Sequence, residues 1–262
     1  MRSLKMVLVL MVVLALTVVV FVPLAWLRAV DSLPAALESK YDIELQLRQR
    51  IESERKAAQG GKFQQEKVSV AWPTPDFTHL PKDLVALYIN ALGCPNFFGT
   101  PQEQGFEWNK RLFNSLRGVG GSGNGRCELN VSRHLAELLG AKTTMEFGVA
   151  ADRVHRFLKK DELIAFDLET MNFGGGVIGV HAAAKALMKK DLEELNLAEL
   201  AEFYLVMPPY DLWAAVSTCQ NAALIRTNRD GLLLQLRKSG LITADAEREA
   251  REQMPRCLVV NH

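Results

Sequence analysis

The sequence predicts a mainly α-helical globular domain behind one N-terminal transmembrane helix. A single long apolar run lies near the N-terminus, apolar residues recur at helical spacing from Pro81 onward, and glycines or prolines stand where these stretches end. Of all residues 48% are hydrophobic, and 31 basic side chains nearly balance 30 acidic ones. This near-neutral charge argues against a protein that binds nucleic acid through a basic excess.

The apolar run Met6–Leu27 contains no charged residue. At about 1.5 Å per residue it can cross the ~30 Å hydrocarbon core of a bilayer as a helix. It is longer than the apolar region of a cleaved signal peptide, which favours an uncleaved anchor. Arg2 and Lys5 precede the run, so the positive-inside rule predicts that the rest of the chain lies outside the cytoplasm.

We divide the chain into residues 1–30 as the anchor, 31–72 as a juxtamembrane segment and 73–262 as the globular domain. The juxtamembrane segment leaves three alternatives open. Apolar and polar residues alternate near its start, as in a strand, whereas Ile43, Leu47 and Ile51 would share one face of a helix. A hairpin that turns at Gly60-Gly61 is the third alternative.

The helices of the globular domain are predicted from apolar spacing and from end signals. Pro81 suits a first helical turn, Asn196 with Glu199 resembles a capping box, and Gly140 and Gly240 are stop signals. The predicted helices are Pro81–Leu92, Phe106–Arg117, Val131–Gly140, Arg153–Met171, Leu197–Met207, Leu212–Ile225, Leu232–Lys238 and 244–253.

Two glycine-rich segments interrupt these helices. Gly118–Gly123 formally matches G-x-G-x-x-G, but a helix and not a strand is expected before it, so we reject a dinucleotide site. The second segment, Asn172–Ala184, reads NFGGGVIGVHAAA. Together with Lys160–Ile164 before it and the helix that begins after Asn196, it resembles the peptidoglycan glycosyltransferases of family 51. Their chains read roughly K-x-x-I-L-x-x-Y-L-N-x-x-x-F-G-x-G-x-x-G-V-E-A-A-A.

This resemblance covers about residues 70–254. It implies a lysozyme-like α-helical fold and, for the family's active members, the polymerisation of lipid II. In the family, a glutamate is expected to take the proton from the acceptor hydroxyl, and cations near a second motif offset the departing diphosphate. The family motif that contains this glutamate aligns with a segment of this chain that has other residues at its catalytic positions. These positions are Gly93, Cys94 and Thr100. Glycine has no side chain and cannot act as a base.

The remaining motif positions give candidates for substrate binding and catalysis. The family's G-G-S-T-I-T-Q-Q-L-A-K motif appears split, with Glu137 where its lysine stands. The resemblance implies Ser122, Asn130, Arg133, His134 and Lys142 as substrate-binding candidates, with Glu146 as the candidate catalytic carboxylate.

These departures predict a pseudoenzyme that binds or regulates in the periplasm, anchored in a bacterial inner membrane. Its expected partners are the membrane, a lipid-linked peptidoglycan precursor or a glycan strand, and other cell-wall synthesis proteins. No cofactor or metal is expected. The alternative is an active monofunctional peptidoglycan glycosyltransferase, which would use Glu103, Glu107 or Glu146 and a divalent metal. A muramidase-like hydrolase with Glu107 as its acid is a third hypothesis.

The four cysteines show no C-x-x-C spacing, which makes a zinc site or a thioredoxin-type site a weak interpretation. Disulfides suit an exported domain, while free buried thiols are the alternative. Because the resemblance places two of them beside the family's cleft, we predict a Cys94–Cys127 disulfide, with Cys219–Cys257 as a second.

Overall fold

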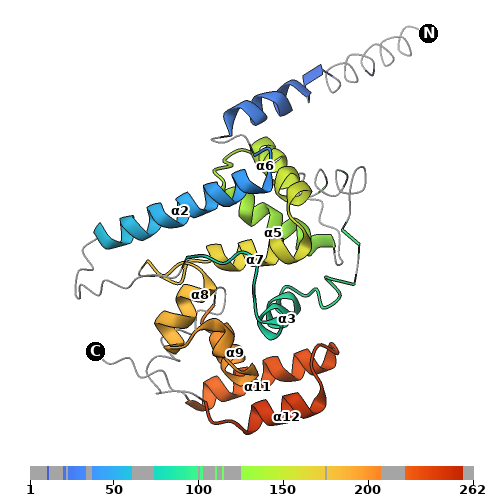
Figure 1. Cartoon of the computed structure of the whole chain (residues 1–262). Coiled ribbons are helices and arrows are strands. Elements are labelled where there is room, and N and C mark those ends of the chain that lie inside the picture. Colours follow the sequence, from blue (N-terminus) through green and yellow to red (C-terminus); the bar gives the residue numbers. More distant parts are fainter. Residues whose placement is uncertain are drawn as a thin grey trace.

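In the computed structural model of the chain, the described secondary-structure elements are helices (Figure 1). The described residues are 11, 20–21, 23–33, 37–60, 74–99, 101–102, 110, 114, 125–174, 176–207 and 222–255, without the side chains of 58–60 and 125–127. Within these residues the β-structure is limited to an isolated bridge between Asn172 and Ile178. The prediction of a mainly α-helical protein is confirmed for the described residues.

The predicted anchor lies mostly outside the described residues, so it stays a prediction. In the part of the chain that is described, no helix is both long and apolar enough to cross a membrane. Residues 23–32 are helical, and their end contacts the globular domain, because Ala29 is buried and Ser32 Oγ donates to Glu146 Oε1 over 2.7 Å.

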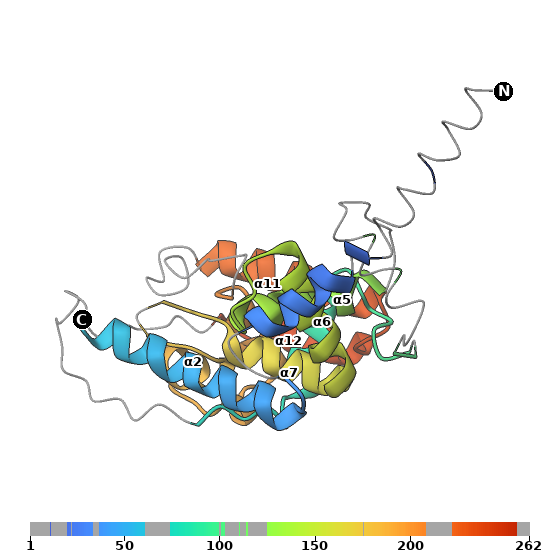
Figure 2. The same cartoon turned by 90° about the horizontal axis from the view of Figure 1, so that it is seen from above.

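The juxtamembrane segment contains helix α2 (Lys40–Gly60), which decides between the strand and the helix that the sequence left open. Its predicted apolar face is confirmed, since Ile43, Leu47 and Ile51 are buried in the main hydrophobic cluster. Figures 1 and 2 show α2 running along α6 and α7, and Lys40 forms an ion pair with Glu162 there. The return strand of the alternative hairpin lies outside the described residues.

Helices α3 (Lys82–Ala91) and α5 (Gly125–Leu138) end in the same way. After α3, Gly93 adopts φ 73° and its N–H bonds to Asn90 O, while Cys94 N–H bonds to Ile89 O. After α5, Gly140 adopts φ 91° and closes its helix with the equivalent pair of bonds. This is the Schellman arrangement, in which a left-handed residue satisfies the last carbonyls of a helix. The predicted stop at Gly140 is confirmed.

The single helix predicted over Arg153–Met171 is wrong, because two helices meet inside it. α6 (Thr144–Phe157) begins nine residues before the predicted start at Arg153, at a capping box in which Thr143 Oγ1 accepts from Glu146 N. α7 (Lys160–Thr170) follows after Leu158 and Lys159, whose backbones are extended. Leu158 is buried, so it contributes to an apolar pattern that continues across the break.

The segment after α7 is confirmed as a break between helices. α8 (Val180–Ala183) leads directly into the π-helical turn η1 (Ala184–Met188), and the 3₁₀ turn η2 (Leu192–Glu194) comes before α9 (Leu197–Tyr204). The predicted capping box of α9 is present, since Asn196 Oδ1 accepts from Glu199 N over 3.0 Å.

One helix, α11 (Ala222–Lys238), replaces the separate helices predicted on either side of Gly231. Asn228–Gly231 therefore form helix and not a connection, while residues 212–221 lie outside the described part. α12 (Ala244–Glu252) confirms the last predicted helix, and Gly240 ends α11 with φ 72°.

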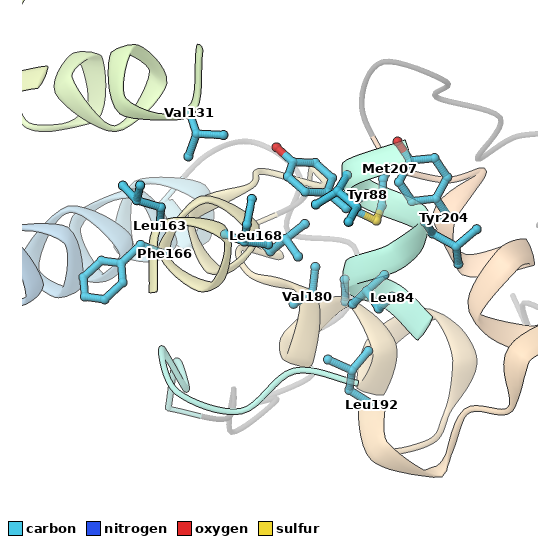
Figure 3. Close-up of a cluster of buried hydrophobic side chains, with 14 of the residues drawn as sticks. Leu84, Tyr88, Val131, Leu163, Phe166, Leu168, Val180, Leu192, Tyr204 and Met207 are labelled. Carbon is cyan, nitrogen blue, oxygen red and sulfur yellow. The ribbon is translucent and has the colours of Figure 1, made fainter. Parts of the chain in front are cut away.

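A single cluster of buried hydrophobic side chains joins these helices. α5 packs against α6 and α7, while α3 packs against α9 and α11. Figure 3 shows the centre of this cluster, in which Leu84 and Tyr88 come from α3, Val131 from α5, Leu168 from α7 and Val180 from α8. The polar end of Tyr88 therefore reaches the place where α3, α5 and α7 meet.

Candidate functional site

A cleft of about 360 Å³ lies where α3, α5 and α7 meet. Apolar and polar side chains share its surface. The described residues that line it are Tyr88, Leu92, Asn130, Val131, His134, Asp167, Met171 and Asn172. Its volume lies near the lower end of the ~300–1,000 Å³ typical of small-molecule sites.

Asp167 is the polar centre of this cleft. Its side chain is 3% exposed, and its two oxygens accept from different elements, Oδ1 from His134 Nδ1 and Oδ2 from the Tyr88 hydroxyl. The side chain of His134 is 42% exposed. Because Nδ1 faces the carboxylate, Nδ1 carries the ring proton in this assignment and Nε2 is the nitrogen left for a ligand.

The contacts of Asp167 also set the protonation of its partners. The hydrogen bond to Asp167 raises the pKa of His134, burial opposes this, and the charges of Asp167 and Glu137 add to the increase. Burial raises the pKa of Tyr88 well above 10, and the Asp167 carboxylate raises it further. Tyr88 is therefore a fixed hydroxyl donor at neutral pH, while His134 is the titrating group of the cleft.

The structure brings together only part of the predicted substrate-binding set. Asn130 and His134 both line the cleft from α5. Arg133 and Lys142 have exposed side chains and are not among the lining residues. Ser122 lies outside the described residues.

Of the three positions predicted to have lost their catalytic side chains, Gly93 has a structural reason to be glycine. A Cβ at this residue would meet nothing within 4 Å, so the space is open, but its left-handed backbone strains any other L-residue. Cys94 is buried and disulfide-bonded. The side chain of Cys127, like Cys219, Cys257 and Thr100, lies outside the described part, so the predicted pairing stays a prediction.

Glu146, the candidate catalytic carboxylate, lies at the start of α6 and not among the residues that line the cleft. Its Oε2 accepts from the backbone N–H groups of Lys142 and Thr143 over 2.8 and 2.9 Å. The hydrogen bond from Ser32 and these two backbone bonds lower the pKa of Glu146 to about 2. The contacts are those of a helix-capping residue.

Asp167, Tyr88 and Asn172 are the polar cleft residues that were not predicted from the sequence. Asp167 had a signal, because the family pattern has tyrosine at this position and a carboxylate is a large change of chemistry. Tyr88 falls inside the predicted helix Pro81–Leu92, and no polar role was predicted for it. Its role could not be found from the sequence, since it depends on where α3 crosses α7.

A second histidine–carboxylate network lies at the start of α8. His181 Nδ1 contacts Glu169 Oε1 at 2.6 Å, and Nε2 contacts Glu193 Oε1 at 2.9 Å. Burial lowers the pKa of His181, but the hydrogen bonds and charges of Glu169 and Glu193 outweigh this and raise it to about 9. Gly179 permits the close approach, because a Cβ there would lie 2.8 Å from Glu169 Oε2.

No metal centre is formed by the described residues, among which three or more histidine, cysteine, aspartate or glutamate side chains nowhere gather in a suitable arrangement. The two histidine networks are instead each built from one ring and its hydrogen-bonded carboxylates.

A helical domain with a polar cleft between α3, α5 and α7 is consistent with the transglycosylase class that the sequence resembles. The family model described as Transglycosylase matches residues 139–229, which run from the end of α5 into α11. The resemblance is therefore confirmed over this segment, which includes Asp167 and Asn172 but not His134.

Curated relatives agree with this match. Penicillin-binding protein 1A of Rickettsia bellii is 32% identical over 97 residues, which cover 37% of this chain and 12% of the relative. Penicillin-binding protein 1A of Rickettsia felis is 31% identical over 99 residues, or 38% of this chain and 12% of the relative. The match thus spans about an eighth of the length of these relatives.

Proposed function

We propose that this protein is a peptidoglycan glycosyltransferase-like protein that binds a lipid-linked peptidoglycan precursor or a glycan strand without polymerising it. The Met6–Leu27 run would hold it in the inner membrane with the helical domain in the periplasm. Other proteins of cell-wall synthesis are the partners that such a position favours. The matched transglycosylase segment and the penicillin-binding relatives support this context.

The observation that carries the proposal is the backbone of Gly93. The motif that would supply the catalytic base falls on a residue that ends α3 in the left-handed conformation, φ 73°. A base at this position would require both a side chain and a strained backbone. Losing a positioned base typically costs about 10²–10⁴ in rate.

The carboxylate of the cleft supports the same conclusion. Asp167 is buried and accepts hydrogen bonds from both Tyr88 and His134. Each of its oxygens accepts one hydrogen bond from a protein donor, which holds the carboxylate against Tyr88 and His134. This carboxylate is better suited to orienting His134 than to acting as the base itself.

The test is a polymerisation assay with lipid II on the detergent-solubilised full chain. We expect no glycan polymer from the wild type, while co-sedimentation with peptidoglycan sacculi or lipid II retention on the immobilised protein persists. Gly93→Glu restores the carboxylate, and Gly93→Ala is its matched control, because both carry the same backbone strain. Robust polymer formation by the wild type would contradict the proposal and favour the active monofunctional enzyme, for which a divalent metal requirement is then the next measurement.

A further inference from the structure

We propose that Glu146 fixes the helix of residues 23–32, the membrane-proximal helix, to the start of α6, and that the globular domain is thereby held in one orientation against a lipid bilayer. This inference rests on the membrane position in the proposed function, and it adds how the domain is attached there. It is carried by the apolar side chains that the membrane-proximal helix exposes at its beginning and by the contacts that it makes with the domain at its end.

The beginning of the membrane-proximal helix has an exposed apolar side. Leu24 and Leu27 lie three residues apart, on one side of the helix, and Val20 and Phe21 come just before them. All four side chains are between 49% and 65% exposed. They belong to the end of the uncharged run Met6–Leu27. Because an exposed apolar side that continues such a run is costly in water, a lipid bilayer is the surrounding that it fits.

The end of the membrane-proximal helix is docked on the domain. Ala29 is buried, Leu33 packs against the main hydrophobic cluster, and Leu37 belongs to that cluster. Figure 1 shows the membrane-proximal helix next to α6. The described residues between the exposed apolar side and α2 therefore contact the domain at several points.

The contact with Glu146 is the polar part of this docking. Ser32 Oγ donates to Glu146 Oε1 over 2.7 Å, with the carbonyl of Ala29 as a longer second acceptor at 3.1 Å. Glu146 Oε2 accepts from the backbone N–H groups of Lys142 and Thr143. Since the Ser32 bond is the first of the causes that lower the pKa of Glu146 to about 2, this carboxylate is ionised near neutral pH and the bond is charge-assisted. One carboxylate thus joins the membrane-proximal helix to the start of α6.

One short helix therefore meets two surroundings. Leu24 and Leu27 face lipid, whereas Ala29 and Ser32 contact the domain. A helix of this length bends little, so the angle between the bilayer and the domain is set by the docking at Glu146 and not by a free linker. Glu146 is thus a positioning residue for the whole domain, which agrees with its place outside the lining of the cleft.

Trypsin cleavage after Arg28 measures the docking, because Arg28 is exposed within the membrane-proximal helix and is cut only when this helix opens locally. The full chain is reconstituted in vesicles of phosphatidylethanolamine and phosphatidylglycerol, and mass spectrometry follows the new N-terminus at Ala29. We expect Ser32→Ala to speed this cleavage about five- to tenfold, since it removes one charge-assisted hydrogen bond. Equal cleavage rates in the wild type and Ser32→Ala would overturn the proposal.

Ser53→Ala is the matched control. Ser53 Oγ also donates to a carbonyl three residues earlier, but it lies on α2 and has no contact with Glu146, so this variant should be cut at the wild-type rate. In a Glu146→Ala background, Ser32→Ala should add little, because its acceptor has gone. Effects of the two changes that simply add would overturn the role of Glu146.

Lipid contact is measured through Trp26, which lies beside Leu27 and is partly buried. We expect lipids brominated in their acyl chains to quench the fluorescence of the wild type in the same vesicles, and Trp26→Phe to lower the quenched fraction. The same quenched fraction in Trp26→Phe would overturn the lipid contact, and a dimer in analytical ultracentrifugation would then assign the apolar side to a second copy of the chain. Polymer formation from lipid II would overturn the proposed function and leave this inference standing.

Discussion

His181 is a residue whose protonation is tied to folding by two neighbouring carboxylates. It lies between Glu169, which is 1% exposed, and Glu193, which is 58% exposed. Its pKa of about 9 lies above the ordinary value of 6.5. A group with a raised folded-state pKa contributes stability that is complete below its unfolded pKa and is lost as the pH rises through its folded pKa.

We therefore expect the free energy of unfolding to fall between about pH 6.5 and pH 9. The loss should be about 1–2 kcal/mol, because exposure of Glu193 to solvent weakens its share of the interaction. Urea unfolding at several pH values measures this slope. Glu169→Gln should abolish most of the slope, whereas Glu193→Gln should reduce it less. An unchanged slope in Glu169→Gln would contradict the assignment.

Among single residues, those whose role depends on nearby sequence could be predicted, and those whose role depends on distant contacts could not. His134 and Asn130 were found because they lie in a motif-bearing helix that faces the cleft. Glu146 was chosen by motif alignment, but its spacing from Thr143 is that of a capping box, which is a signal the sequence also contains. Asp167 and Tyr88 acquire their role only from contact across 79 positions in sequence.

Helix ends could be predicted from the sequence where a glycine or a capping pair marks them. Gly140, Gly240 and the Asn196–Glu199 pair were all expected to end or begin helices, and the structure confirms them. The break at Leu158 was missed, since a buried leucine continues the apolar pattern through it. The continuity of α11 was missed because residues 226–231 were left outside the two predicted helices, although one glycine, Gly231, is tolerated inside a helix held by its apolar face.

Two glycines at the element scale give opposite predictions for the same substitution. Gly93 ends α3 with φ 73°, whereas Gly231 lies within α11 with nothing within 4 Å of an added Cβ. Gly93→Ala should lower the free energy of unfolding by about 1–2 kcal/mol, because alanine is strained in the left-handed region. Gly231→Ala should raise it by about 0.5–1 kcal/mol, because alanine is the better helix former. Thermal and urea unfolding of both variants measure the difference, and equal effects would contradict the cap.

At the scale of the whole molecule, Arg229 connects the matched transglycosylase segment to the last helix. It is fully buried, and its guanidinium donates to Glu202 Oε1 of α9 over 2.8 Å. It also donates to the backbone oxygens of Gln253 and Arg251 at the end of α12, over 3.0 and 3.3 Å. One side chain thus joins α9, α11 and α12, and it lies at the last residue of the matched segment, 139–229.

Arg229→Met should therefore destabilise the whole domain and not only α12. The change keeps a long apolar stem but leaves the Glu202 carboxylate, which is 2% exposed, without this guanidinium. Breaking a buried ion pair from one side typically costs about 3–5 kcal/mol. Arg248→Met is the matched control, because its partner Asp245 is 83% exposed and such pairs contribute about 0–1 kcal/mol. Urea unfolding that showed similar small losses for both variants would mean that α12 is held to the domain by its apolar contacts alone.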